Sequence, residues 1–144
     1  MEKITAIFDK KQQTKSNRIG PECFIIDALS YMNVHNLECV AVTDDEDSLL
    51  GLLTEHDIAR KFFLPGSLNL NTSVYEIMNT QFPFADINDS IEHCMQLMKD
   101  FGTRYLPVFD LKSFKGIISA DEILAEVIRV HSDIFDQKEE KSSL

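Results

Sequence analysis

Apolar and polar positions in the first half of the chain follow an order that predicts four elements. Leu29 and Met32 follow Ile25 or Ile26 at spacings that put them on one face of a helix. The runs "CVAV" and "LLGLL" are short and apolar, as buried strands are, and "EHDIARKFF" begins a further helix. The prediction is therefore a helix, two strands and a helix, at residues 24–32, 39–42, 49–53 and 55–63.

The second half of the chain repeats this order. Ser90 is placed to cap a helix whose apolar residues recur three, four and three positions apart, at Ile91, Cys94, Met98 and Phe101. The strands "LPVF" and "KGIIS" and the helix "ADEILAEVIRV" follow, at residues 106–109, 115–119 and 120–130.

The two halves also match residue by residue, which indicates an internal duplication. "LECVAVTD" resembles "RYLPVFD", with Val42 matching Val108 at an offset of 66 residues. "GLLTEHDI" matches "GIISADEI", with Gly51 matching Gly116 at an offset of 65. A unit with two or three short strands buries too little apolar surface alone, so the two units must pack together.

These patterns predict an α/β (α+β) chain made of two tandem repeats. The first repeat, with the N-terminal segment, is placed at residues 1–66, the second at 67–134, and a flexible C-terminal tail at 135–144. Between the repeats, "LPGSLNLNTS" is typical of a turn-rich linker, and "VYEIM" at 74–78 of a short helix that opens the second repeat.

The charge of the chain argues against nucleic acid as a partner. Fourteen basic and twenty-four acidic residues give a formal net charge of −10, and residues 21–144 carry −13 because the first twenty are basic. A phosphate backbone is bound through lysine and arginine side chains, which are scarce here.

Cysteine usage and hydropathy favour a cytoplasmic protein without a membrane anchor. The three cysteines, Cys23, Cys39 and Cys94, have no CxxC spacing, and no apolar leader precedes them. No apolar run approaches the roughly 20 residues that a bilayer-spanning helix needs.

A Ser/Thr-x-x-acid motif follows the last strand of each repeat, as Thr54-x-x-Asp57 and Ser119-x-x-Glu122. One interpretation is a capping box, in which hydroxyl and carboxylate satisfy backbone N–H groups of the first helical turn. The other is a nucleotide site, because helix N-termini after strands attract anions and a carboxylate accepts hydrogen bonds from ribose hydroxyls. Both interpretations can hold together.

The ordered set "TEHDIARK", "EIM" and "RYLPV" resembles a tandem cystathionine-beta-synthase-type (CBS) domain pair, over roughly residues 15–132. The resemblance implies two β-α-β-β-α units in a pseudo-twofold Bateman module, with clefts between the repeats able to hold adenosine compounds. It also implies that Thr54 and Ser119 lie near phosphate or ribose and that Asp57 holds the ribose hydroxyls. Related stand-alone members often carry Arg where this chain has His56, and Glu122 replaces the expected Asp in the second repeat.

Cationic partners for a phosphate are few. Arg60 follows the first motif by one turn and either reaches a phosphate or pairs with Asp57 or Glu55. Arg104 lies just before a strand of the second repeat, where it faces a ligand or forms a structural ion pair.

Neither a metal site nor an enzyme motif is recognisable in the sequence. With this, the resemblance implies a non-enzymatic regulatory module that binds an adenosine nucleotide, such as AMP, ADP or ATP, or else NADH or S-adenosylmethionine, and needs no other cofactor. The alternative is an interaction or scaffold module with an empty cleft. We also expect an unidentified effector protein and a homodimer, the latter from apolar residues on several helix faces at Phe62, Phe63, Met95 and Leu97.

Overall fold

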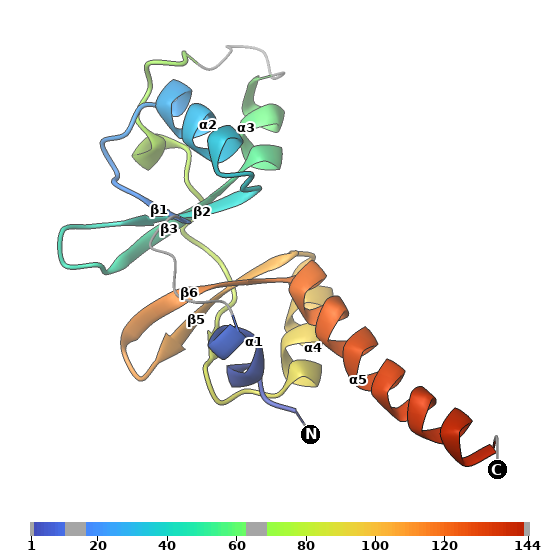
Figure 1. Ribbon diagram of the computed structural model, residues 1–144. Coiled ribbons are helices and arrows are strands. Elements are labelled where there is room, and N and C mark those ends of the chain that lie inside the picture. The colour runs from blue at the N-terminus through green and yellow to red at the C-terminus, as the bar shows by residue number, and fades with distance from the viewer. Residues whose placement is uncertain (1, 11–16, 63–68, 143–144) are drawn as a thin grey trace.

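The computed structural model describes residues 2–10, 17–62 and 69–142, with side chains as far as residue 132. The helices are α1 Thr5–Lys10, α2 Ile25–Val34, α3 Glu55–Phe62, α4 Ile91–Phe101 and α5 Ala120–Ser142, with a short 3-10 helix η2 at Val74–Glu76 (Figure 1). The strands are β1 Arg18–Ile19, β2 Cys39–Thr43, β3 Leu49–Thr54, β4 Ala85–Asp86, β5 Tyr105–Asp110 and β6 Ser113–Ser119.

Each repeat forms a small three-stranded sheet, and the two sheets share one topology. In the order β1-β2-β3 the first pair is parallel and the second antiparallel, and β4-β5-β6 repeats this arrangement. The registers agree as well, since Val42 lies opposite Gly51 and Val108 opposite Gly116. The predicted α+β class and the β-α-β-β-α order of both repeats are confirmed.

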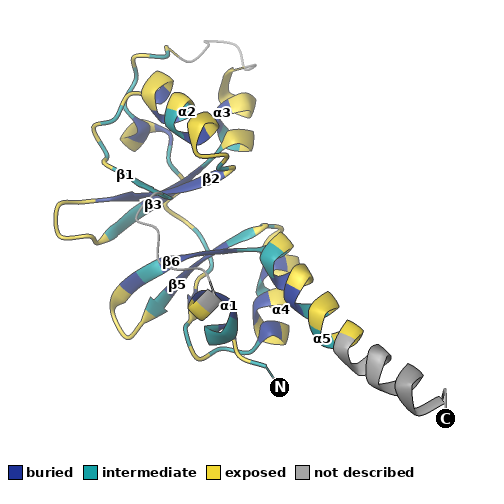
Figure 2. Cartoon of the chain, in the orientation of Figure 1, coloured by how far each residue is buried: buried dark blue, intermediate teal, exposed yellow. Residues whose placement is uncertain are grey.

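The two sheets lie next to each other in the middle of the molecule, with helices on the outside (Figure 1). Helices α2 and α3 cover the first sheet, and α1, α4 and α5 cover the second. Between the sheets lies an apolar cluster of Cys39, Ala41, Leu52, Phe114 and Ile117. Figure 2 shows buried residues along the strands and on the inner faces of the helices. No described helix is long and apolar enough to cross a membrane.

Each repeat's core is completed by a segment that precedes the other repeat in the chain. The sequence pattern groups the N-terminal segment with the first repeat, but Ile4, Ile7 and Phe8 pack in the core of the second. Likewise the side chains of "VYEIM", the segment predicted to open the second repeat, complete the other core, because Val74 and Ile77 pack in the first. A segment this short can bury its apolar side chains only against a sheet whose face is partly uncovered. The local sequence does not indicate which of the two sheets that is.

Backbone hydrogen bonds hold the two exchanged segments in equivalent places. Ile4 N donates to Asp89 O at 3.0 Å, and Val74 N donates to Cys23 O at 2.8 Å. Ile91 N donates to Glu2 O at 3.0 Å, and Ile25 N to Thr72 O at 2.9 Å in the other repeat. The N-terminal segment is therefore the structural counterpart of residues 72–78.

Glycine in β3 and β6 makes room for these segments. A Cβ added at Gly51 would lie 2.7 Å from Met78 Sδ and 2.9 Å from Asn79 O, and one added at Gly116 would lie 3.1 Å from Phe8 Cε1. Asn79 also exchanges two backbone hydrogen bonds with Leu52, at 2.8 and 2.9 Å. The duplicated glycine thus marks the point where each exchanged segment crosses its sheet.

Arg18 ties the two repeats together beside the sheets. Its guanidinium pairs with Asp47 on the β2–β3 hairpin, donates to Lys115 O at 3.2 Å and lies 4.7 Å from the centre of the Phe114 ring. These contacts join β1 of the first repeat to β6 of the second.

The last helix extends farther than the sequence pattern predicts. The apolar spacing supports a helix over residues 120–130, whereas α5 continues to Ser142 and takes in most of the segment predicted as a flexible tail at 135–144. Residues 131–142 include no glycine or proline to end the helix.

We predict that Gly51→Ala destabilises the fold by about 1–3 kcal/mol, because the added methyl overlaps the backbone of Asn79 as well as the Met78 side chain. Thermal unfolding should show a midpoint lower by several degrees. Gly20→Ala is the matched control, since nothing lies within 4 Å of a Cβ at that position. Equal stability of the two variants would contradict the proposed role of Gly51.

Candidate functional site

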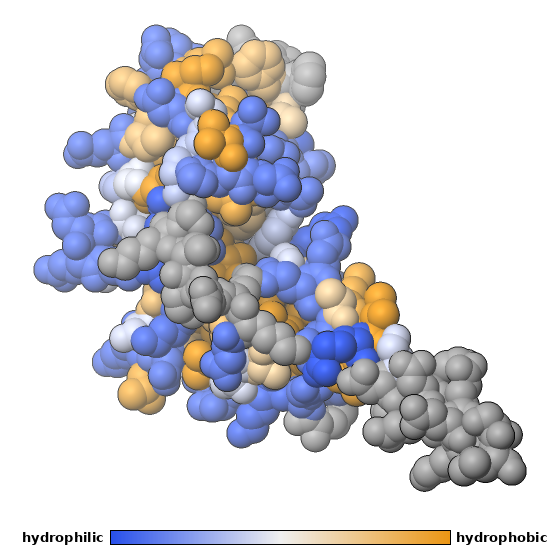
Figure 3. Space-filling model, in the orientation of Figure 1, coloured by the Kyte–Doolittle hydropathy of each residue, from blue (hydrophilic) through white to orange (hydrophobic). Residues whose placement is uncertain are grey.

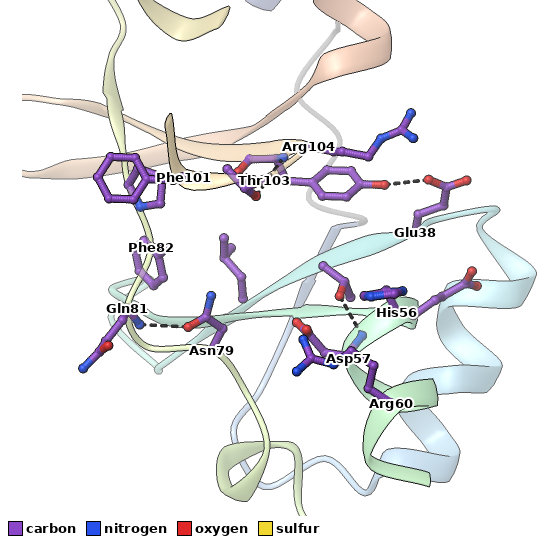
Figure 4. Close-up of a pocket in the computed structure, with 16 residues that line it drawn as sticks. Glu38, His56, Asp57, Arg60, Asn79, Gln81, Phe82, Phe101, Thr103 and Arg104 are labelled. Atoms are coloured by element: carbon purple, nitrogen blue, oxygen red, sulfur yellow. Dashed lines mark hydrogen bonds between the residues drawn. The ribbon is translucent and has the colours of Figure 1, made fainter. Parts of the chain in front are cut away.

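A cleft of about 640 Å³ lies between the repeats, where β3 passes into α3 and faces the turn between α4 and β5 (Figure 4). This volume lies in the usual range for small-molecule sites, about 300–1,000 Å³. Its walls come from the first repeat, from the segment between η2 and β4, and from the turn between α4 and β5. The lining residues are Glu38, Leu52, Thr54, Glu55, His56, Asp57, Arg60, Asn79, Gln81, Phe82, Pro83, Phe101, Gly102, Thr103, Arg104 and Tyr105.

The first-repeat motif is half of a capping box. Thr54 Oγ1 accepts a hydrogen bond from Asp57 N at 3.0 Å, which caps α3. The Asp57 carboxylate makes no hydrogen bond or ion pair with any described residue, although it is only partly exposed. Burial, with a smaller contribution from this carboxylate, raises the pKa of the Cys39 thiol to about 12. Because Asp57 lines the cleft and its carboxylate has no such bond among the described residues, its oxygens are available to a ligand there.

The second-repeat motif is a complete capping box. Glu122 N donates to Ser119 Oγ at 3.1 Å, and Ser119 N donates back to Glu122 Oε1 at 3.2 Å. The Ser119 hydroxyl also lies 3.0 Å from the same carboxylate oxygen. The longer Glu side chain reaches the cap residue, and neither Ser119 nor Glu122 lines the cleft described above.

The three predicted cationic contacts all line this cleft, but they differ in their partners. Arg60 and His56 are exposed and form no ion pair with the described residues. Arg104 instead pairs with Asp121 at 2.9 Å, so it lies at the cleft and in a structural ion pair at once. The pairing of Arg60 with Asp57 or Glu55 that helical spacing allows is not formed.

A hydrogen bond between the repeats crosses the wall of the cleft. Tyr105 Oη donates to Glu38 Oε2 at 2.6 Å (Figure 4). Burial and this bond to the carboxylate raise the pKa of Tyr105 above its ordinary value. Neither residue belongs to a motif in the sequence. Glu38 precedes β2 and Tyr105 begins β5, and these are not equivalent positions, since Glu38 matches Arg104 in the duplication.

The cleft has a polar end and an apolar end. Figure 4 shows His56, Asp57 and Arg60 at one end and Phe82 and Phe101 at the other. Such an arrangement suits a ligand with a flat apolar ring joined to a polar, hydroxylated group. Phe82 lies between η2 and β4 and Phe101 ends α4, so only the folded chain brings them to the same end of the cleft.

Comparison with known proteins assigns both repeats to one domain family. A family model described as "CBS domain" matches residues 17–63 and 74–129. The protein YhcV of Bacillus subtilis is 31% identical over 110 residues, which cover 76% of this chain and 77% of YhcV. The mitochondrial protein CBSX3 of Arabidopsis thaliana is 27% identical over 113 residues, and the chain spans 55% of its length.

Solved structures share the fold. The CBS domain structure NE2398 is 32% identical, with a TM-score of 0.81, and the match covers 89% of this chain and 99% of that one. CBSX2 in complex with AMP is 16% identical, with a TM-score of 0.74 and coverage of 91% and 99%. The CBS domain pair of MJ0100, in complex with 5′-methylthioadenosine and S-adenosylmethionine, is 19% identical, with a TM-score of 0.71 and coverage of 96% and 98%.

We predict that Tyr105→Phe lowers the free energy of unfolding by about 0.5–1.5 kcal/mol at neutral pH, because it removes the bond to Glu38. The raised pKa favours the protonated phenol in the fold, so this contribution is present below about pH 10 and is lost as pH rises further. Urea unfolding measures the change. Tyr75→Phe, at an exposed tyrosine, is the control, and an equal loss in both variants would argue against the bridge.

Proposed function

Because the chain belongs to the CBS domain family, as its repeated motifs indicated, we propose that it is a non-enzymatic regulatory module that binds an adenosine compound between its repeats. The observation that carries the proposal is the Asp57 carboxylate, which lines the cleft and is left without a hydrogen-bond partner among the described residues. A partly buried carboxylate of this kind is stabilised by a ligand that donates hydrogen bonds to it.

The groups around Asp57 fit the parts of an adenosine compound. Asp57 accepts from the ribose hydroxyls, and the Thr54 hydroxyl, which already accepts from the helix, donates to the ligand. Phe82 at the apolar end supports the base, and Arg60 with His56 meets the 5′ substituent. The ligands of CBSX2 and MJ0100 support this model, since AMP, 5′-methylthioadenosine and S-adenosylmethionine share the adenosine moiety.

Regulation requires that the ligand favour one arrangement of the repeats over another. The cleft is suited to this because its walls come from both repeats and the Glu38–Tyr105 bond joins them. The receiver of the signal is an effector protein, and the setting is the cytoplasm. The competing function is a scaffold module whose cleft stays empty and whose Thr54-x-x-Asp57 motif serves only as a cap.

A homodimer is part of the same proposal. Phe62 and Met95 are 46% and 41% exposed, whereas Leu97 packs against the second core and Phe63 lies outside the described residues. The structure adds exposed apolar residues on α4 and α5, at Phe101, Leu124 and Ile128. Figure 3 shows apolar side chains along the first half of α5, a surface that a second copy would cover.

The binding test uses Asp57→Asn, which keeps the size of the side chain and removes its charge. Losing one or two charge-assisted hydrogen bonds should weaken AMP binding about tenfold to more than a hundredfold by calorimetry. Glu122→Gln is the matched control and should leave affinity unchanged, with about one site per chain. Equal losses in both variants, or none in either, would favour the cap-only function.

The dimer is tested by light scattering from micromolar to hundred-micromolar protein. We expect a mass about twice the 16.5 kDa of the chain, and the substitution Ile128→Glu should shift it toward the monomer. A monomeric mass across the whole range would exclude the homodimer.

A further inference from the structure

The charged groups that line the cleft are unfavourable for a polyphosphate. Three carboxylates line it, those of Glu38, Glu55 and Asp57, against the two guanidinium groups of Arg60 and Arg104. His56 is the remaining titratable side chain among the lining residues apart from Tyr105.

The positive charge that is available to a ligand is smaller still. Arg104 is already paired with Asp121 at 2.9 Å, so a phosphate there would have to compete with a carboxylate. Arg60 is the lining guanidinium that no described residue pairs. A single guanidinium, at +1, offsets only part of the charge of one phosphate group, which carries about −1.5 to −2 at pH 7.

The sequence around the first-repeat wall of the cleft adds little positive charge. Between residues 19 and 98, Arg60 and Lys61 are the only formally cationic side chains, and the chain carries a net charge of −10. An acidic body lowers the local concentration of multiply charged anions, raises that of cationic ligands and leaves that of neutral ligands unchanged.

The position of the carboxylates adds to this effect. Glu55 and Asp57 flank His56 on the first turn of α3, and all three line the cleft. Each phosphate added beyond the first meets no second unpaired guanidinium among the described residues that line the cleft. In water, two like unit charges about 6 Å apart weaken association by about threefold.

Resting on the proposed adenosine site, we propose that this cleft selects adenosine compounds with a neutral, cationic or singly phosphorylated 5′ substituent and discriminates against adenosine di- and triphosphates. The ligand class is thus 5′-methylthioadenosine, S-adenosylmethionine and AMP. The selection comes from the shortage of unpaired cations around Arg60 and not from the size of the cleft.

The test is calorimetry with 5′-methylthioadenosine, AMP, ADP and ATP in buffer free of divalent cations. ATP should bind at least about tenfold more weakly than AMP, with ADP between them and 5′-methylthioadenosine no weaker than AMP. Raising the ionic strength should reduce the ratio of AMP affinity to ATP affinity, because screening acts most on the multiply charged ligand.

Glu55→Gln should also reduce the ratio of AMP to ATP affinity, by about threefold, since it removes one lining carboxylate. Glu46→Gln is the matched control: it changes the net charge equally on the exposed β2–β3 hairpin and should leave the ratio as in the unmodified chain. ATP binding as tightly as AMP at low salt would overturn the charge selection while leaving the adenosine site intact. Failure of all four compounds to bind would instead reject the proposed function.

Discussion

The contact between the two sheets is the feature on which the rest of the molecule depends. Cys39, Ala41 and Leu52 of one sheet meet Phe114 and Ile117 of the other, and all five are buried. A three-stranded sheet covered by helices on one face must bury its other face, and the second repeat supplies the matching surface. At one end of the packed sheets, the cleft lies between the start of α3 and the turn that joins α4 to β5.

The exchanged segments make each repeat dependent on the other. Phe8 packs against Gly116 in the second sheet, and Met78 packs against Gly51 in the first. Each core therefore includes side chains from the other half of the chain. A ligand that moves one repeat therefore also acts on a segment packed in the other. Under the proposed function, this shared packing would let occupancy of the cleft alter the surface that an effector protein meets.

The duplicated helix starts show how one methylene separates two roles. In the second repeat Glu122 reaches back to Ser119 N and completes the cap, which uses its carboxylate internally. In the first repeat the shorter Asp57 leaves Thr54 to cap the helix alone, and its oxygens stay at the cleft. The second-repeat motif thus stabilises its helix, and the first-repeat motif has the proposed role in ligand recognition.

The sequence by itself determined the repeat, two strands and two helices in each copy, and the motif with Thr54, His56, Asp57 and Arg60, because these depend on local periodicity and on short spacings. Helix α1 and the two-residue strands β1 and β4 were not predicted by that periodicity. It also contained, unrecognised, the match of "ITAIF" to "VYEIM" that marks the exchanged segments. Only the tertiary structure decided which sheet each segment covers, that Arg104 pairs with Asp121, and that Glu38 meets Tyr105 across 67 positions. Those contacts join residues far apart in the chain, and their formation depends on how the two sheets pack, which no local pattern encodes.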